Sequence, residues 1–403
     1  MKITITHNKR LRPPSLLLRY KWYISLNYKS SSGTEGTEVM DMKDITFEAD
    51  LGLNQKDSWV KINHQQMGFY RVLYPDAMWA SFSTHLVQTD PDQWKLSSPD
   101  RSGLLNDAFS LAAAGLVSYE VPLQLMSYLA KEREYVPWAS ALTGVSYIHR
   151  MLRLDPEFGL WTKFLGDQVR PAVTALGFSD EDTQPYITRI LRPMLMSTAL
   201  WTDDEQTLAY VQNEFRAWLD NGTIPTSVNT RGTVYAYGLE QFGTDRDWES
   251  LWQRYLVESS PQEKERIMDA LARARQPHLI MRLLNYAKEG KHIRRQDFFT
   301  VVADVGRNPA AFGLLWDWTR ANYQSFVDRF SITDRYFGRM LYYMTRDYNT
   351  EFKLQEVKDL FEQFPEAGAG ERYRKMALES IEKNIYWMKN FRSVVLNWLK
   401  TNA

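Results

Sequence analysis

The sequence predicts a mainly α-helical protein that begins with a short β region. Before Pro75, apolar and polar side chains alternate, as around Ile24, Leu26 and Tyr28, which is the period of a half-buried strand. After Pro75, apolar residues recur three and four positions apart, which is the period of amphipathic helices. We therefore expect a partial β-sandwich domain over residues 1–74 and a large α-helical domain over residues 75–403.

Four segments of the β region have the pattern of strands. The alternation runs over residues 20–28 and returns over residues 45–49. Residues 59–62 and 69–74 flank a polar turn at residues 63–68 and are rich in β-branched and aromatic side chains. We expect these last two segments to be two strands joined by that turn.

Several residues of the helical region predict where helices begin and end. Ser98 is the predicted N-cap of one helix, because Pro99 suits the first helical position and Asp100 favours the positive end of the helix dipole. Gly115 predicts the end of that helix. At the C-terminus one apolar stripe predicts a long final helix, and the stripe consists of Leu378, Ile381, Ile385, Met388, Val395 and Leu399.

Short connectors separate the predicted helices, for example at residues 180–182, 221–225, 259–261 and 308–309. Short loops favour antiparallel neighbours. No sequence repeat of fixed period is visible, so we expect a curved solenoid of HEAT- or armadillo-like helical hairpins whose sequences have diverged.

The composition excludes several kinds of site and partner. The 49 basic and 49 acidic residues leave the chain neutral, so no overall charge attracts nucleic acid. The absence of cysteine excludes disulfides, thiolate ligands and thiol nucleophiles. No apolar run is long enough to cross a membrane or to act as a signal peptide, so we expect the chain as written to be cytoplasmic. If the chain were secreted, the sequon at Asn221 would predict glycosylation.

The histidines do not form a zinc motif. A zinc-binding helix needs two imidazoles one turn apart. No two of the six histidines lie within four positions of each other; they are His7, His64, His85, His149, His278 and His292. We therefore expect no catalytic residue, no metal ligand and no cofactor in this chain.

Two further clusters have structural explanations. The glycines at 368 and 370 lack the third glycine of a dinucleotide-binding fingerprint, so residues 368–370 are predicted to form a bend, with Glu371 in the first turn of the next helix. The acidic residues at 180–182 lack the spacing of a calcium-binding loop, and we expect them to stabilise a helix N-terminus.

Arg335 and Arg339 are the candidate substrate-binding residues. They lie four positions apart at a predicted helix start and therefore share one face of it. Two planar guanidinium groups on one face can bind a carboxylate. The alternative is a surface helix in which the arginines form internal ion pairs.

Several ordered motifs resemble the C-terminal region of M1-family zinc aminopeptidases. They are WVKIN at 59–63, GFYRVLY at 68–74, SPDR at 98–101, LLNDAF at 104–109 and EYVPW at 134–138. The resemblance implies the end of a small β-sandwich followed by a helical domain that closes over the active site. It also implies that the zinc-binding and exopeptidase motifs, both absent here, belong to a catalytic domain outside this chain.

Further motifs look most like the glutamyl branch of that family, which removes N-terminal Glu or Asp. They are FEQFPEAGAGE at 361–371, NIYWMK at 384–389 and NWL at 397–399. The resemblance implies that Arg335 helps to position the acidic side chain of the substrate, although the neighbouring Asp334 could neutralise it. For the full-length enzyme it implies zinc, calcium in the glutamyl branch, peptide substrates, a homodimer formed through the helical domain, and a place on the extracellular face of the plasma membrane.

Three hypotheses for the chain remain open. It is a fragment of a longer aminopeptidase, or a stand-alone, non-catalytic module that binds peptides or proteins, or a helical domain supplied in trans to a separate catalytic half. In each case we expect the chain alone to have no aminopeptidase activity.

Overall fold

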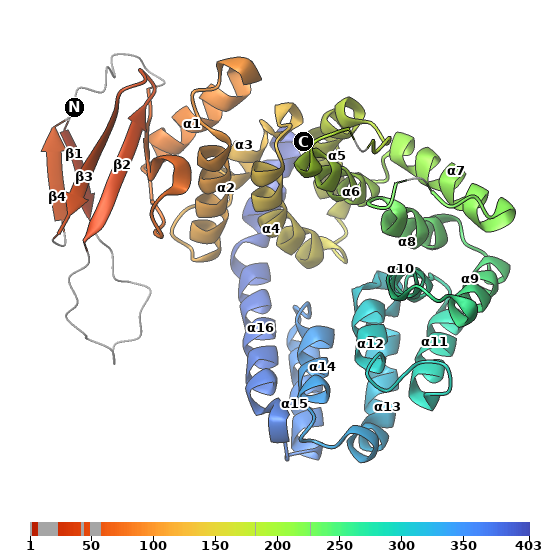
Figure 1. Cartoon of the computed structure of the whole chain (residues 1–403). Coiled ribbons are helices and arrows are strands. Elements are labelled where there is room, and N and C mark those ends of the chain that lie inside the picture. Colours follow the sequence, from red (N-terminus) through yellow and green to blue (C-terminus); the bar gives the residue numbers. More distant parts are fainter. Residues whose placement is uncertain (1, 7–22, 42–43, 49–57, 182, 226) are drawn as a thin grey trace. The chain divides into compact units, whose positions relative to one another are not determined.

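A computed structural model describes residues 2–6, 23–41, 44–48, 58–181, 183–225 and 227–403 (Figure 1). By its contacts the chain divides into two compact units. Unit 1 comprises Met1–His149 and Asn397–Asn402, and unit 2 comprises Arg150–Leu396 and Ala403. The domain boundary between residues 74 and 75 stays a prediction, because compactness of contacts alone does not define a domain.

Unit 1 begins with two small antiparallel sheets. The strands are β1 Lys2–Thr6, β2 Ile24–Ser30, β3 Glu35–Met40, β4 Asp44–Glu48 and β5 Val60–Ile62. Strand β1 pairs with β4, and β2 lies between β3 and β5. In β2 the side chains of Leu26, Tyr28 and Ser30 are buried, which confirms the predicted alternation there. Residues 20–22 and 49 of the predicted strands lie outside the described residues.

The strand predicted over residues 69–74 is wrong. This segment is not part of a sheet in the described structure, although its side chains still alternate between exposed and inward positions. Its backbone is held by side chains instead of by a neighbouring strand. The Val72 amide donates to Asp107 Oδ2 at 3.1 Å, and the Tyr74 hydroxyl bridges the backbone N–H and C=O groups of Ile62 at 2.9 and 3.1 Å. The polar turn before it contains a short 3-10 helix, η1 His64–Gln66.

Helices follow in unit 1. They are α1 Asp76–Gln88, η2 Pro91–Gln93, α2 Ser98–Ala113, α3 Glu120–Met126, η3 Leu129–Lys131 and α4 Tyr135–Leu152, the last of which ends in unit 2. The predicted N-cap of α2 is wrong by one residue. Ser97, not Ser98, caps the helix, and it forms a reciprocal capping box with Asp100. Gly115 has a φ of 69° just after this helix, as predicted for its end.

Unit 2 is built from helical pairs. Its helices are α5 Phe158–Leu176, α6 Tyr186–Leu200, α7 Glu205–Asn221, α8 Arg231–Phe242, α9 Asp245–Val257, α10 Pro261–Ala272, α11 Pro277–Glu289, α12 Phe298–Arg307, η4 Pro309–Ala311, α13 Phe312–Phe330, α14 Arg335–Thr345, α15 Glu351–Gln363, η5 Gly368–Gly370, α16 Glu371–Asn390 and α17 Arg392–Asn402, which ends in unit 1. The mainly α-helical class is thereby confirmed. Helices α8, α10, α12, α14 and α16 contact one another in succession and form one layer of the unit (Figure 1).

Polar contacts between successive pairs recur at similar sequence separations. Arg216 and Asp247 are 31 residues apart, Arg231 and Glu263 are 32 apart, and Arg273 and Glu240 are 33 apart. Asn308 donates to the carbonyl of Ala274, 34 residues before it. A recurrence of this kind is typical of stacked repeats, whereas the HEAT- or armadillo-like character of the pairs stays a prediction.

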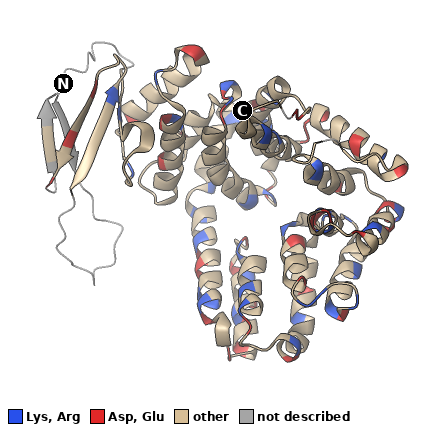
Figure 2. Ribbon diagram, viewed as in Figure 1, with Lys and Arg blue, Asp and Glu red and all other residues tan. Residues whose placement is uncertain are grey.

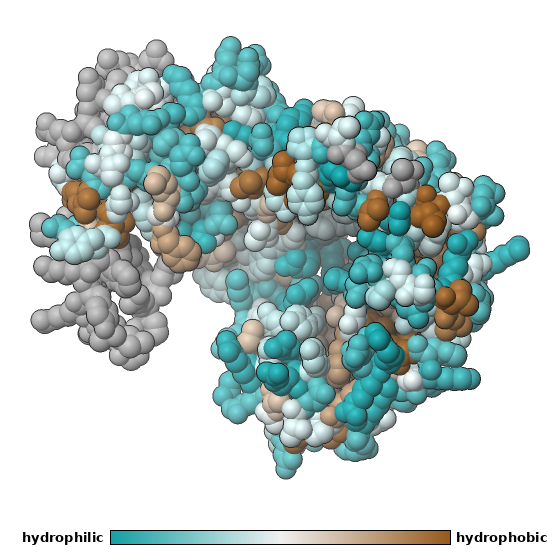
Figure 3. Space-filling view, in the orientation of Figure 1, coloured by the Kyte–Doolittle hydropathy of each residue, from teal (hydrophilic) through white to brown (hydrophobic). Residues whose placement is uncertain are grey.

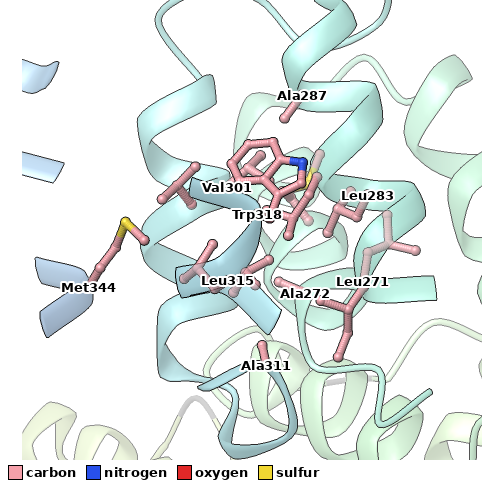
Figure 4. Packing of buried hydrophobic residues seen from close by; sticks show 14 of the residues in the cluster. Leu271, Ala272, Leu283, Ala287, Val301, Ala311, Leu315, Trp318 and Met344 are labelled. Carbon is pink, nitrogen blue, oxygen red and sulfur yellow. The ribbon is translucent and has the colours of Figure 1, made fainter. Parts of the chain in front are cut away.

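One continuous apolar cluster holds α7 to α16 together. Its members include Leu271, Leu283, Val301, Leu315 and Trp318, which converge from neighbouring helices (Figure 4). The face of the molecule in Figure 3 is mostly hydrophilic, with small hydrophobic patches. Truncation of one large side chain in such a core typically costs about 3–5 kcal/mol.

The C-terminal end differs from the prediction of one long helix. It consists of α16 and α17, which are separated at Phe391, where φ is −119°. The predicted bend before it is confirmed, since η5 occupies residues 368–370 and Glu371 opens α16.

Candidate functional site

Helix α14 has one buried and one open face. Phe337, Met340, Leu341 and Met344 are buried on the first face, and the Thr319 hydroxyl lies 3.7 Å from the sulfur of Met344. Because this packing fixes the rotation of the helix about its axis, the residues on the opposite face are directed away from the core.

Asp334 caps α14. Its Oδ1 atom accepts hydrogen bonds from the backbone amides of Tyr336 at 2.8 Å and Phe337 at 3.1 Å. Within the described residues no ion pair or hydrogen bond joins Asp334 to Arg335. The carboxylate therefore satisfies the helix N-terminus and leaves the Arg335 guanidinium without a partner on its own helix.

Arg335 and Arg339 share the open face of α14, as predicted. Arg335 is exposed and Arg339 is partly buried. In the described part of the chain neither side chain forms a hydrogen bond or an ion pair, so the internal ion pairs of the alternative reading do not form. By contrast, Arg216 donates from both terminal nitrogens to the two carboxylate oxygens of Asp247, at 2.9 Å each.

Aromatic rings hold the Arg339 guanidinium in place. Its central carbon lies 6.0 Å from the centre of the Tyr336 ring and 5.4 Å from that of Tyr373 on α16. Both distances are within the range of cation–π attraction. Within the described structure the Arg339 Nε atom is buried without a hydrogen-bond partner. Contacts to ring faces leave the in-plane N–H groups of a guanidinium free to donate to an anion.

Asp180 does not act as predicted. Asp180 lies in the loop before α6 and not at its first turn. Its carboxylate accepts from Arg189, Ser227 and Asn229 at 2.8 Å each. Burial raises the pKa of Asp180, but these hydrogen bonds outweigh it and the pKa lies below its ordinary value. Asp182 lies outside the described residues.

Asn221 is the last residue of α7 and is exposed, and Gly222 follows it with a φ of 73°. Modification of Asn221 stays a prediction. Across the described ranges no group of three or more His, Asp or Glu side chains is arranged to hold a metal ion.

Sequence reasoning missed several residues beside the two arginines. Arg346 lies over the ring of Tyr343 at 5.7 Å, and the rings of Tyr342 and Tyr373 are 6.4 Å apart. Arg346 lies seven positions, or two helical turns, after Arg339, so the sequence alone could have predicted that it shares their face. The sequence could not have predicted the approach of Tyr373, because it depends on how α14 packs against α16.

Comparisons with known proteins agree with the motifs. Residues 59–383 match the family model described as the ERAP1-like C-terminal domain. The chain is 34% identical to glutamyl aminopeptidase of Bitis rhinoceros over 396 residues, which cover 96% of this chain and 40% of that protein. It is 32% identical to the human glutamyl aminopeptidase over 388 residues (96% and 40%), and 26% identical to human aminopeptidase N over 393 residues (95% and 40%). The chain therefore spans about 40% of the length of these relatives.

No helix in the described part of the chain has both the length and the apolar character that a membrane span requires.

Proposed function

Because the chain belongs to the family of ERAP1-like C-terminal domains, we propose that it forms the substrate-cavity part of an M1 zinc aminopeptidase of the glutamyl type. The chain corresponds to the C-terminal portion of relatives with that name. In this proposal the whole enzyme removes N-terminal acidic residues from peptides. The zinc ion and the groups that activate water come from a catalytic part outside this chain.

The observation that carries the proposal is the unpartnered guanidinium of Arg335. In the described structure it stands at the start of α14, where the helix dipole disfavours a positive charge, and its nearest acidic neighbour in sequence is engaged as the helix cap. Such an arrangement does not stabilise the helix. It does leave a charged, forked donor for the carboxylate of a substrate, with Arg339 on the same face.

In the reaction Arg335 binds and orients the substrate. A carboxylate held by the guanidinium places the N-terminal residue of the peptide in one position, and binding that is equal in the ground and transition states lowers KM without raising kcat. Neutral N-terminal residues lack this contact, so the discrimination between Glu and Gln at that position measures the role of Arg335.

The test compares two short peptide amides, EAAA and QAAA, bound to the purified chain and followed by NMR titration. We expect the chain to bind EAAA about five- to tenfold more tightly, since a charge-assisted hydrogen bond contributes about 1–1.5 kcal/mol at an exposed site. Arg335→Gln should abolish the difference. Arg246→Gln is the matched control, because Arg246 is also an exposed arginine in the first turn of a helix, α9. An unchanged preference in Arg335→Gln would contradict the proposed role.

The proposal also predicts that the chain alone does not hydrolyse a glutamyl amide. Turnover by the pure chain that a zinc chelator blocks would overturn this prediction.

The wider setting is part of the same proposal. We infer a homodimer formed through the helical region, a location on the extracellular face of the plasma membrane for the whole enzyme, and glycosylation at Asn221 if the chain enters the secretory route. The mass of the purified chain by light scattering tests the first of these.

A further inference from the structure

The open face of α14 continues beyond the two candidate arginines. Arg335, Arg339, Tyr342 and Arg346 are separated by four, three and four positions, so they form one stripe along the helix. We propose that this stripe is a track for an extended acidic peptide, in which Arg346 forms a second anion-binding position. The track rests on the proposed function, since it starts at Arg335.

All the charged side chains of α14 are basic. From Arg335 to Thr345 the helix carries two arginines and no acidic residue (Figure 2). Arginines four positions apart on one helix repel each other. Asp347, directly after Arg346, is bound by Arg150 at 3.0 Å, so it is engaged elsewhere. In the described structure Arg346 has neither an ion pair nor a side-chain hydrogen bond, and its guanidinium lies over the ring of Tyr343.

Several arginines on other helices of unit 2 have carboxylate or carbonyl partners. Arg231 is paired with Glu263 at 3.0 Å and Arg320 with Glu356 at 2.9 Å. Arg254 donates to the carbonyl of Leu219 at 2.9 Å. In the described part of the chain the guanidinium groups of Arg335, Arg339 and Arg346 have no acidic or carbonyl partner to offset their mutual repulsion, although tyrosine rings contact two of them. Local costs of this kind are expected at binding sites.

Tyrosines line the same surface. Tyr336 is 65% exposed and Tyr343 is 42% exposed, and the rings of Tyr342 and Tyr343 are 5.5 Å apart. Tyrosine and arginine together are typical of the residues that contribute most to protein recognition. Flat rings between the guanidinium groups provide apolar contact for the peptide backbone and for small side chains.

The spacing of the charges defines the ligand. A helix rises about 1.5 Å per residue, so Arg335 and Arg346 are about 16 Å apart along the axis. An extended peptide advances about 3.3 Å per residue, so this separation corresponds to about five residues. Successive side chains of an extended peptide point to opposite faces, so two acidic side chains that meet the same helix face lie an even number of positions apart. The favoured ligand is therefore a peptide of five or more residues that carries acidic side chains at its first and fifth positions, with the long arginine side chains spanning the remaining difference.

The test uses three heptapeptide amides with a free N-terminus, EAAAEAA, EAAAQAA and QAAAEAA, and measures Kd for the whole chain by NMR titration. We expect EAAAEAA to bind about three- to tenfold more tightly than EAAAQAA, and this gain should shrink as salt is raised. Arg346→Gln should remove the gain at the fifth position and leave the preference for Glu at the first position unchanged. Arg335→Gln should have the opposite pattern.

Two further variants make the result decisive. Arg346→Lys keeps the charge at the end of α14 and should retain part of the gain, which excludes a loss caused by unfolding. Arg246→Gln should behave as the unmodified chain. Equal Kd values for EAAAEAA and EAAAQAA, or a gain that survives Arg346→Gln, would overturn the track. If the unmodified chain showed no preference for Glu at the first position, the proposed function would be contradicted instead.

Discussion

A β-carbon added to Gly338 would lie 2.7 Å from the Cα atom of Gly370 and 2.8 Å from its backbone nitrogen. Real β-carbons do not approach backbone atoms this closely. The backbone of α14 therefore touches the backbone of η5, immediately before α16. This contact sets how closely the helix that carries Arg339 approaches the helix that carries Tyr373.

We predict that Gly338→Ala destabilises unit 2 by about 1–3 kcal/mol, because the methyl group can be accommodated only by separating two backbones. The thermal midpoint should fall by about 2–4 °C per kcal/mol for a unit of this size. The same substitution should weaken the Tyr373 contact of Arg339, which the aromatic NMR signals would report.

Gly313→Ala is the control for this prediction. Gly313 lies in α13, and a β-carbon there would meet no atom of the described structure within 4 Å. Alanine is the better helix former, so this variant should be neutral or slightly stabilised. A similar loss in both variants would show that the contact between Gly338 and Gly370 is not what α14 depends on.

A second prediction concerns the contact between the first and last segments of unit 2. Arg392 at the start of α17 donates to Asp155 from both Nε and Nη2, the second bond being 2.9 Å long. Asp155 is nearly inaccessible, with 3% of its side chain exposed, so the amide of an asparagine in its place would put a buried N–H group against the donors of Arg392. We expect Asp155→Asn to cost about 1–3 kcal/mol in the free energy of unfolding by urea.

The exposed pair of Lys375 and Glu371, at 2.8 Å, is the contrast. Both side chains are 70% exposed, and exposed pairs contribute little. Glu371→Gln should therefore cause no measurable change. If both substitutions were neutral, the ion pair between Arg392 and Asp155 would not contribute to the closure of unit 2.

The sequence predicts much of this architecture because most of its helices are amphipathic and capped locally. The turn at Gly115, the bend at residues 368–370 and the shared face of Arg335 and Arg339 each follow from neighbouring residues alone.

The sequence-based predictions fail where the local structure depends on residues that are distant in the sequence. The segment at 69–74 has the composition of a strand, yet Asp107 on α2 accepts its backbone hydrogen bond. The apolar stripe continues from α16 into α17 past Phe391, so the periodicity of the sequence does not predict the break at that residue. At the candidate site, the ring of Tyr373 reaches Arg339 from α16, so no pattern within α14 predicts the contact.

The last prediction concerns Asp304 on α12. Burial raises the pKa of its carboxyl group to about 7, and Arg307 beside it lowers that pKa only in part. The acidic groups Asp269 and Glu265 on α10 raise it further, while Arg273, directly after the same helix, opposes them.

The sign of the pH effect follows from this shift. Between about pH 4 and pH 7 the unfolded chain loses the Asp304 proton while the folded chain retains it, so stability falls as the pH rises through this range. The contribution is on the order of 4 kcal/mol, since the pKa rises from its ordinary value of 3.8 to about 7. The substitution Asp304→Asn keeps the shape of the side chain and removes its titration. Arg307 then retains Asp269, at 3.3 Å, as a partner.

We expect Asp304→Asn to become more stable relative to the unmodified chain as the pH rises from 5 to 8, measured by thermal midpoints at both values. Asp247→Asn is the matched control. Burial raises the pKa of Asp247, but the hydrogen bonds from Arg216 and Thr244 outweigh it, and the pKa lies below its ordinary value. Because Asp247 is ionised in both the folded and the unfolded chain above pH 5, the cost of its replacement should not change between pH 5 and 8. A cost of Asp304→Asn that is equally independent of pH would show that Asp304 is ionised throughout this range.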